Sequence, residues 1–200
     1  MDKSRRRGIN RSVIKQPTLE TERLVLRPLT PKDAPNLACL AGRREIADTT
    51  ISIPHPYSEQ QARQWLAGNV ELCVKGKVVV FGVQLKGDAK LVGSAGLRDI
   101  EVEHAQAELG FWIAVECWGK GYATEAARAV LRFGFEQLGL NRIYAHHMVR
   151  NPASGRVLAT VGMQREGLLR QRVRKWGVFE DVVPLAILRK EWMCYRLELL

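Results

Sequence analysis

The chain has 200 residues and a formal net charge of +10 at pH 7, and 46% of its residues are hydrophobic. This length matches one domain of ordinary size, and this hydrophobic content excludes an intrinsically disordered chain. No apolar run reaches the roughly 20 residues that span a bilayer, and no apolar segment follows the basic residues Arg5–Arg7. We therefore predict a cytoplasmic protein with a single domain over residues 18–200.

The positive charge is unevenly distributed along the chain. Residues 1–16 carry six Lys and Arg residues against one Asp, which is half of the excess, and we predict a basic, flexible leader over residues 1–17. A second basic cluster spans residues 165–175. Basic stretches favour RNA, ribosomes or acidic partners, although many are solvated surface. Aromatic residues do not alternate with these charges as a base-stacking platform requires.

The first third of the chain predicts one strand and two helices. Polar and apolar residues alternate over residues 23–29, as in a half-buried strand. Thr30 followed by Pro31 then predicts a helix start, because threonine caps helices and proline suits their first turn. Two prolines within residues 53–57 predict a loop. Ser58 with Gln61 forms a capping box for a second helix.

The remaining chain alternates strand-like and helix-like segments. A hairpin is expected where residues 86–89 separate two strands, and a helix from Tyr122 is expected to stop at Gly139. The pattern predicts an α+β domain with a mixed, mostly antiparallel seven-stranded sheet flanked by about four helices. The later strands are expected at residues 78–85, 90–98, 107–115, 142–149, 164–169 and 178–188, and the later helices at residues 122–138 and 152–161.

The most informative segment is Glu116–Ala126, which joins a strand-like run to a helix-like run. Gly119 and Gly121 remove side chains where the backbone must turn tightly. The first free amides of a helix, with the positive end of its dipole, bind anions. The segment lacks the Gly-Lys-Ser/Thr of a P-loop and the third small residue of a dinucleotide fingerprint. It therefore predicts either a phosphate cradle of another kind or a plain helix entry.

The run Trp118–Ala126 closely resembles the acetyl-CoA loop of GCN5-related N-acetyltransferases (GNAT), and the closest branch is the RimJ/RimL type. Three further segments match this family in order: residues 21–27 resemble its first strand, residues 108–112 its fourth strand, and residues 151–158 its fourth helix. One residue departs from the family pattern, because Trp118 stands where Gln or Arg is general, although this branch often has an aromatic residue there.

The resemblance implies a sheet whose fourth and fifth strands, residues 107–115 and 142–149, splay apart around acetyl-CoA. Backbone amides from Trp118 to Ala123 would bind the pyrophosphate, Lys120 could add a positive charge, and the backbone of Ile113 and Val115 would pair with pantetheine. The residues expected to hold acetyl-CoA are Ile113, Val115, Trp118, Gly119, Lys120, Gly121, Tyr122, Ala123 and Asn151.

The resemblance also implies catalytic roles. Ser154 is expected to be the general acid at the departing sulfur. Glu108 is expected to be the general base, either with a pKa raised by neighbours such as Trp112 or acting through a water molecule.

Weaker expectations concern histidines and metals. His55 and Trp112 are weak candidates for substrate contacts. Adjacent strand residues point to opposite faces, so at most one of His146 and His147 is expected in the cleft. The spacing of Cys and His predicts no metal site.

The implied activity is acetyl-CoA-dependent N-acetylation of a primary amine by direct attack in a ternary complex. The branch implies the N-terminal amine of a protein, such as a ribosomal protein. Two alternatives remain open: acetylation of a small amine (a polyamine, amino acid or aminoglycoside), and a non-catalytic RNA- or ribosome-binding module. Family members often form homodimers, and residues 178–188 and 192–200 could serve either the core or such an interface.

Overall fold

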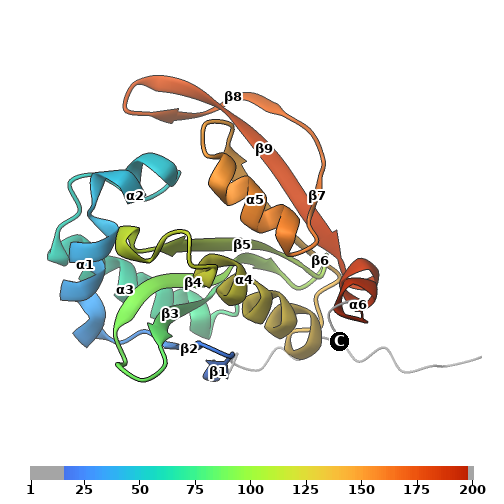
Figure 1. Cartoon of the computed structure of the whole chain (residues 1–200), viewed down its shortest axis with the longest axis horizontal. Helices are drawn as coiled ribbons and strands as arrows, with labels where there is room; N and C mark the ends of the chain where they lie inside the picture. The colour runs from blue at the N-terminus through green and yellow to red at the C-terminus, as the bar shows by residue number, and fades with distance from the viewer. Residues whose placement is uncertain (1–15, 198–200) are drawn as a thin grey trace, which may run out of the picture.

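A computed structural model describes residues 16–197 as one mixed sheet with helices on both faces (Figure 1). The strand order is β1-β2-β3-β4-β5-β6-β9-β7, and β8 pairs with β9. The predicted fold class is confirmed, with nine strands rather than seven. The strands are β1 (Leu19–Glu20), β2 (Leu24–Pro28), β3 (Val79–Leu85), β4 (Leu91–Glu101), β5 (Gln106–Ile113), β6 (Arg142–Met148), β7 (Gln164–Arg165), β8 (Leu169–Lys175) and β9 (Val178–Leu188).

The additional strands have physical explanations. β1 and β7 have two residues each, too short for a pattern of alternation. The predicted strand at residues 164–169 is divided between β7 and β8, with Gly167 at a φ of 157° between them. β8 has basic side chains at four of its seven positions, so its composition indicated solvated surface.

Within residues 16–197, six α-helices accompany the sheet, and two of them were not predicted. These two are α2, which is short and has no side-chain cap, and α6, which the sequence left undecided between core and interface. In α6 the Trp192 ring stacks on Phe135 at 5.8 Å between centroids and is 3% exposed, so this side chain belongs to the core. The helices are α1 (Ala34–Ala41), α2 (Arg44–Thr49), α3 (Glu59–Val74), α4 (Tyr122–Arg132), α5 (Pro152–Thr160) and α6 (Arg189–Leu197).

Helix α4 covers one face of the sheet and α3 lies on the other (Figure 1). The buried side of α4 presents small and branched residues at helical spacing, including Ala127, Val130 and Leu131. A π-helical turn, Phe133–Gln137, follows α4 and places Phe133 against Phe81 of β3. On the opposite face, α1 and α3 form a smaller apolar cluster with the sheet. The sheet is therefore held rigidly from both sides.

The predicted splay is confirmed between β5 and β6. These parallel strands pair only where residues 106–108 lie beside residues 142–144. Beyond that point β5 stays paired with β4, and β6 stays paired with β9. The gap that results opens the sheet to both of its faces, and it positions the site described below.

The predicted basic leader falls almost wholly on residues 1–15, which lie outside the described residues. At its end, Gln16 Nε2 donates a hydrogen bond to the Val80 carbonyl at 2.6 Å. Within residues 16–197, no helix is both long enough and apolar enough to cross a membrane.

Candidate active site

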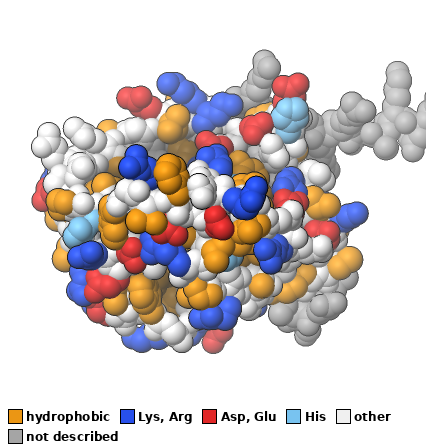
Figure 2. Space-filling view, turned by 90° about the horizontal axis from the view of Figure 1, so that it is seen from above, with side chains coloured by type: hydrophobic (Ala, Val, Ile, Leu, Met, Phe, Trp, Pro, Cys, Tyr) orange, Lys and Arg blue, Asp and Glu red, His pale blue; other side chains and the backbone are white. Residues whose placement is uncertain are grey.

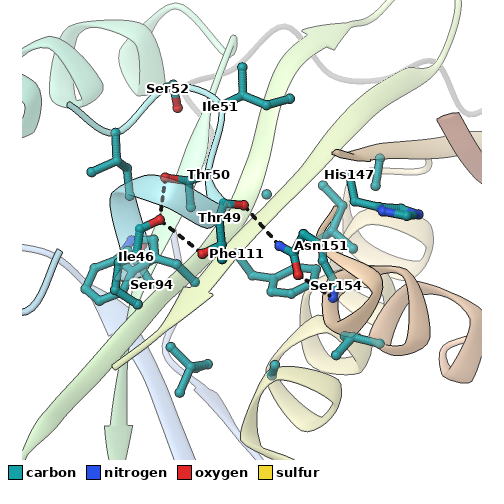
Figure 3. Close-up of a pocket in the computed structure, with 18 of the residues that line it drawn as sticks. Ile46, Thr49, Thr50, Ile51, Ser52, Ser94, Phe111, His147, Asn151 and Ser154 are labelled. Carbon is teal, nitrogen blue, oxygen red and sulfur yellow. Dashed lines mark hydrogen bonds between the residues drawn. The ribbon is translucent and has the colours of Figure 1, made fainter. Parts of the chain in front are cut away.

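A cleft of about 830 Å³ passes through the gap between β5 and β6. One side is lined by apolar residues of α1, α2, α3 and the segment between α2 and α3, such as Ile46, Tyr57 and Trp65. The other side is lined by the start of α4 and by α5, including Gly121 and Ser154. Figure 3 shows α2 and α5 facing each other across this region, with β5 between them. We call these the acceptor side and the α4–α5 side.

The glycine-rich loop has the geometry of an anion site. Gly119 and Gly121 have φ values of 73° and 79°, in the left-handed region that favours glycine. The amides of Gly119–Ala123 donate to no backbone carbonyl within the described residues, and the first amides of α4 cannot have intrahelical partners. A Cβ at Gly119 would meet no atom within 4 Å. The backbone is therefore exposed to a ligand at the positive end of α4.

The structure corrects what was expected of Trp118 and its neighbours. The Trp118 amide donates to the Val115 carbonyl at 3.1 Å, and its indole Nε1 donates to the Ile113 carbonyl at 2.6 Å. Trp118 therefore has no N–H left for a pyrophosphate. The carbonyls of Ile113 and Val115, whose backbone is expected to pair with pantetheine, each accept one hydrogen bond from Trp118. The indole bond instead braces the end of β5 against the loop.

Glu125 and Arg23 fix the loop to the β1–β2 turn. The Glu125 carboxylate accepts hydrogen bonds from Thr21 Oγ1 (2.6 Å), Arg23 N (2.8 Å) and Arg23 Nε (2.7 Å). Arg23 Nη1 donates to the Lys120 carbonyl at 3.0 Å. Burial opposes ionisation of Glu125, but the bonds from Thr21 and Arg23 outweigh it and lower its pKa. The Lys120 side chain is exposed and does not line the cleft.

Asn151 is engaged on both of its amide atoms. Its Oδ1 accepts a hydrogen bond from the Ser154 amide at 3.2 Å, which confirms the predicted helix cap. Its Nδ2 donates to the Thr49 carbonyl at 3.0 Å and so links α5 to the end of α2 (Figure 3). Asn151 lines the cleft, and its two hydrogen bonds join α5 to α2 at the edge of the cleft. The half-buried Ser154 lines the same part of the cleft.

Glu108 lies at the base of the splay, 8% exposed, beside two partners. Its Oε1 accepts a hydrogen bond from Arg98 Nη2 at 2.6 Å and lies 3.3 Å from His146 Nδ1. Burial alone would raise the pKa of Glu108, but the bonds from His146 and Arg98 prevail and lower it. The expected raised pKa is therefore wrong, because the sequence did not reveal the guanidinium on β4.

The two adjacent histidines both line the cleft, so the expectation of at most one was wrong. They do point to opposite faces of β6, but the cleft passes through the sheet and reaches both faces. His147 Nδ1 bonds to the Met148 carbonyl at 2.9 Å. His55 does not line the cleft, and its Nδ1 contacts the Gly42 carbonyl at 2.9 Å. Trp112, the other candidate for a substrate contact, lines the acceptor side.

The lining of the cleft has little negative charge. Glu108 is the one carboxylate that lines it within the described residues, and Arg98 is its ion-pair partner. Arg150 and Arg156 also line the cleft. No group of three or more His, Cys, Asp or Glu residues in positions 16–197 could hold a metal ion.

Comparisons with known proteins agree with this geometry. Residues 23–164 match the family model described as an acetyltransferase (GNAT) domain. The chain is 32% identical to the uncharacterized N-acetyltransferase p20 of Bacillus licheniformis, over 88% of this chain and 98% of that protein. It is 28% identical to the ribosomal protein uS5-alanine N-acetyltransferase of Escherichia coli (strain K12), over 91% of this chain and 96% of that protein.

Among solved structures, the spermidine N-acetyltransferase of Vibrio cholerae in complex with CoA and spermine superposes with a TM-score of 0.77. The two are 26% identical, over 86% of this chain and 99% of that one. The chain therefore belongs to the GNAT acetyltransferase family and is an N-acetyltransferase that uses acetyl-CoA. The loop that resembles the family's acetyl-CoA loop is the one whose amides the fold leaves open.

Proposed function

We propose that this enzyme acetylates the N-terminal amine of a protein or peptide. The observation that carries the proposal is the charge of the acceptor side. An acceptor with several ammonium groups, such as a polyamine, requires several carboxylates, whereas the one carboxylate lining the described cleft is paired with Arg98. The remaining acceptor side is largely apolar, with Ile46, Tyr57 and Trp65. It suits a single amine followed by uncharged side chains.

The basic surface gives less support to the RNA-binding alternative. Lys175, which the sequence placed in a basic cluster, is buried, and its Nζ donates to the Ile53 carbonyl at 2.7 Å. Arg174 lies over the Phe179 ring, 5.5 Å from its centroid. On the face seen in Figure 2, basic side chains are mixed with acidic and hydrophobic ones rather than gathered in one block. We therefore do not propose RNA binding, and the experiments below test it as an alternative.

The proposed roles follow the geometry. The amides of Gly119–Ala123 hold the pyrophosphate at the start of α4. Acetyl-CoA supplies the activated acetyl group as a thioester. The neutral amine enters from the acceptor side and attacks the thioester carbon, so that a C–N bond forms and the C–S bond breaks. Ser154 on α5 gives its proton to the departing sulfur, and the proton lost by the new amide nitrogen restores the hydroxyl. The rigid cleft orients the two reactants, which is a major part of such catalysis.

Calorimetric titration with acetyl-CoA tests the cofactor part of the proposal. We expect binding by the wild type and a loss of at least about 30-fold in Gly121→Trp, because the new side chain occupies the amide cradle at an unfavourable φ. Gly139→Ala is the matched control. It also replaces a glycine at positive φ, 72°, but it lies beyond the far end of α4. Equal losses in both variants would contradict the assignment of the loop.

Release of CoA tests the acceptor. Peptides with a free N-terminus, the same peptides with a blocked N-terminus, and spermidine are compared at equal concentration. The proposal requires CoA release with the free peptides only. Faster release with spermidine would contradict it in favour of the small-amine alternative. Salt-sensitive RNA binding without CoA release from any amine would support the non-catalytic alternative.

A further inference from the structure

A histidine and a carboxylate from different strands meet at the base of the cleft. His146 lies on β6 and Glu108 on β5, at the point where the two strands stop pairing. The His146 Nδ1 atom is 3.3 Å from Glu108 Oε1. Their side chains are 26% and 11% exposed, so the contact is largely shielded from solvent.

The chemistry of this contact determines which ring nitrogen carries the proton. The bonds from His146 and Arg98 keep Glu108 ionised, and an ionised carboxylate only accepts hydrogen bonds. Nδ1 must therefore donate, which leaves the lone pair of a neutral imidazole on Nε2. Within residues 16–197 no hydrogen bond engages His146 Nε2, and the residue lines the cleft.

His146 also lies on the correct face of the sheet. Its neighbours on β6, Ala145 and Ile143, point into the main core beneath α4 and α5. Because strand residues alternate, His146 points to the opposite face, the acceptor side, with Glu108 and Trp112. Ser154 approaches from α5 on the α4–α5 side. A residue on the acceptor side can thus take a proton from the acceptor amine, while Ser154 on the α4–α5 side gives one to the departing sulfur.

We propose that His146 is the general base that takes the proton from the acceptor amine, and that Glu108 is a positioning residue that orients the imidazole. This inference rests on the proposed function. An ammonium acceptor transfers one proton to His146 Nε2 and becomes a neutral amine. The amine nitrogen then attacks the thioester carbon, and the sulfur leaves with the C–S electron pair and takes the Ser154 hydroxyl proton. The proton that the new amide nitrogen loses restores the Ser154 hydroxyl. His146 returns its proton to water after the product leaves.

Several charged groups surround the imidazole and bear on its pH response. Glu108 on β5 and Arg98 on β4 lie on one side. The Tyr144 ring lies 5.6 Å away in an edge contact, and Glu166 beside β7 adds a more distant negative charge. On the paired strand β9 the facing residue is Pro184, which is uncharged. Among these groups, Glu108 is the one whose atoms lie within hydrogen-bond distance of the ring nitrogen.

The test is the pH profile of kcat/KM for CoA release with an N-terminal peptide, measured beside the dissociation constant of acetyl-CoA. For His146→Gln we expect a fall in kcat of about 100-fold, a change in acetyl-CoA affinity below about threefold, and loss of the acid limb of the profile. The matched control is His104→Gln, an exposed histidine in the β4–β5 turn, which should behave as wild type. His147→Gln tests the competing histidine on the other face.

Glu108→Gln tests the positioning role separately. Removing the carboxylate should lower kcat for CoA release and leave the dissociation constant of acetyl-CoA within about threefold of wild type, whereas a purely structural role would weaken both. A second measurement needs no variant. The NMR titration of His146 in the wild-type protein should have the same midpoint as the acid limb.

The outcomes separate the two proposals. A wild type that releases no CoA with any amine or peptide overturns the proposed function, and the role of His146 falls with it. If the wild type is active, three results overturn only the His146 inference: His146→Gln within about threefold of wild type, a larger loss in His147→Gln, or an NMR midpoint apart from the acid limb.

Discussion

Glu125 offers the sharpest test of how the loop is held. Its side chain is 14% exposed and accepts hydrogen bonds from Thr21 Oγ1 and from Arg23 N and Nε. Hydrogen bonds to charged groups contribute about 1.5–3 kcal/mol each. Arg23 is 46% exposed, so solvent screening reduces its share. We expect Glu125→Gln, which keeps one acceptor, to lower the free energy of unfolding by about 2–3 kcal/mol, or about 5–10 °C in Tm.

The stability lost in Glu125→Gln should depend on pH, and the pKa of Glu125 sets the direction of that dependence. The bonds to Glu125 hold its folded-state pKa below the ordinary value, so folding favours the ionised form. Its contribution to stability is fully present above the unfolded pKa, about 4.3, and is lost as the pH falls through the folded value. The difference in stability between the wild type and Glu125→Gln should therefore be full at pH 7 and shrink below about pH 4.

Chemical denaturation at several pH values measures this difference, and acetyl-CoA titration measures its effect on the loop. The loop should bind acetyl-CoA more weakly in Glu125→Gln, because Arg23 also holds the Lys120 carbonyl. Glu59→Gln is the control: it breaks an exposed ion pair with Arg63 within α3 and should change stability by less than about 0.5 kcal/mol. Equal denaturation midpoints for wild type and Glu125→Gln at pH 7 would refute the reasoning.

The remaining predictions concern chemistry and packing. Ser154→Ala should lower kcat about 10- to 100-fold with little change in acetyl-CoA affinity, measured by CoA release and calorimetry; unchanged turnover would remove Ser154 from the mechanism. Gly93→Ala should destabilise the sheet by about 1–3 kcal/mol, because its Cβ would collide with a backbone carbonyl of β5, whereas Gly110→Ala has open space; equal midpoints in urea would contradict this. Asp33→Asn should cost about 1–3 kcal/mol, because Arg27 loses a 2.6 Å ion pair; a melting temperature equal to wild type would be the contrary result.

The core elements were predictable because their signals are local. The capping box of Ser58 and Gln61 is present, and β9 has the predicted bounds. Helix α4 begins at Tyr122, after a glycine whose φ only glycine adopts at low cost. Helix α2 and strand β8 were not predicted, because one lacks a cap and the other lacks apolar alternation. Tertiary contacts hold them: Arg150 pairs with Asp48 of α2, and β8 is held by its antiparallel pairing with β9.

By itself, the sequence determined the fold class and the loop at the start of α4, because periodicity, caps and positive-φ glycines act within a few residues of each other. The splay of the two strands was expected only from the resemblance to the GNAT family. Only the tertiary structure decided which charges meet. Arg98 and His146 contact Glu108 from two other strands. Arg23 contacts Glu125 although the two residues are about a hundred positions apart in the sequence. These contacts lower the pKa of Glu108, whereas a raised pKa was one of the two alternatives expected from the sequence. They also give His146 a hydrogen-bond partner. Ionisation and proton transfer depend on distances across the sheet, which strand order and register set and local sequence does not encode.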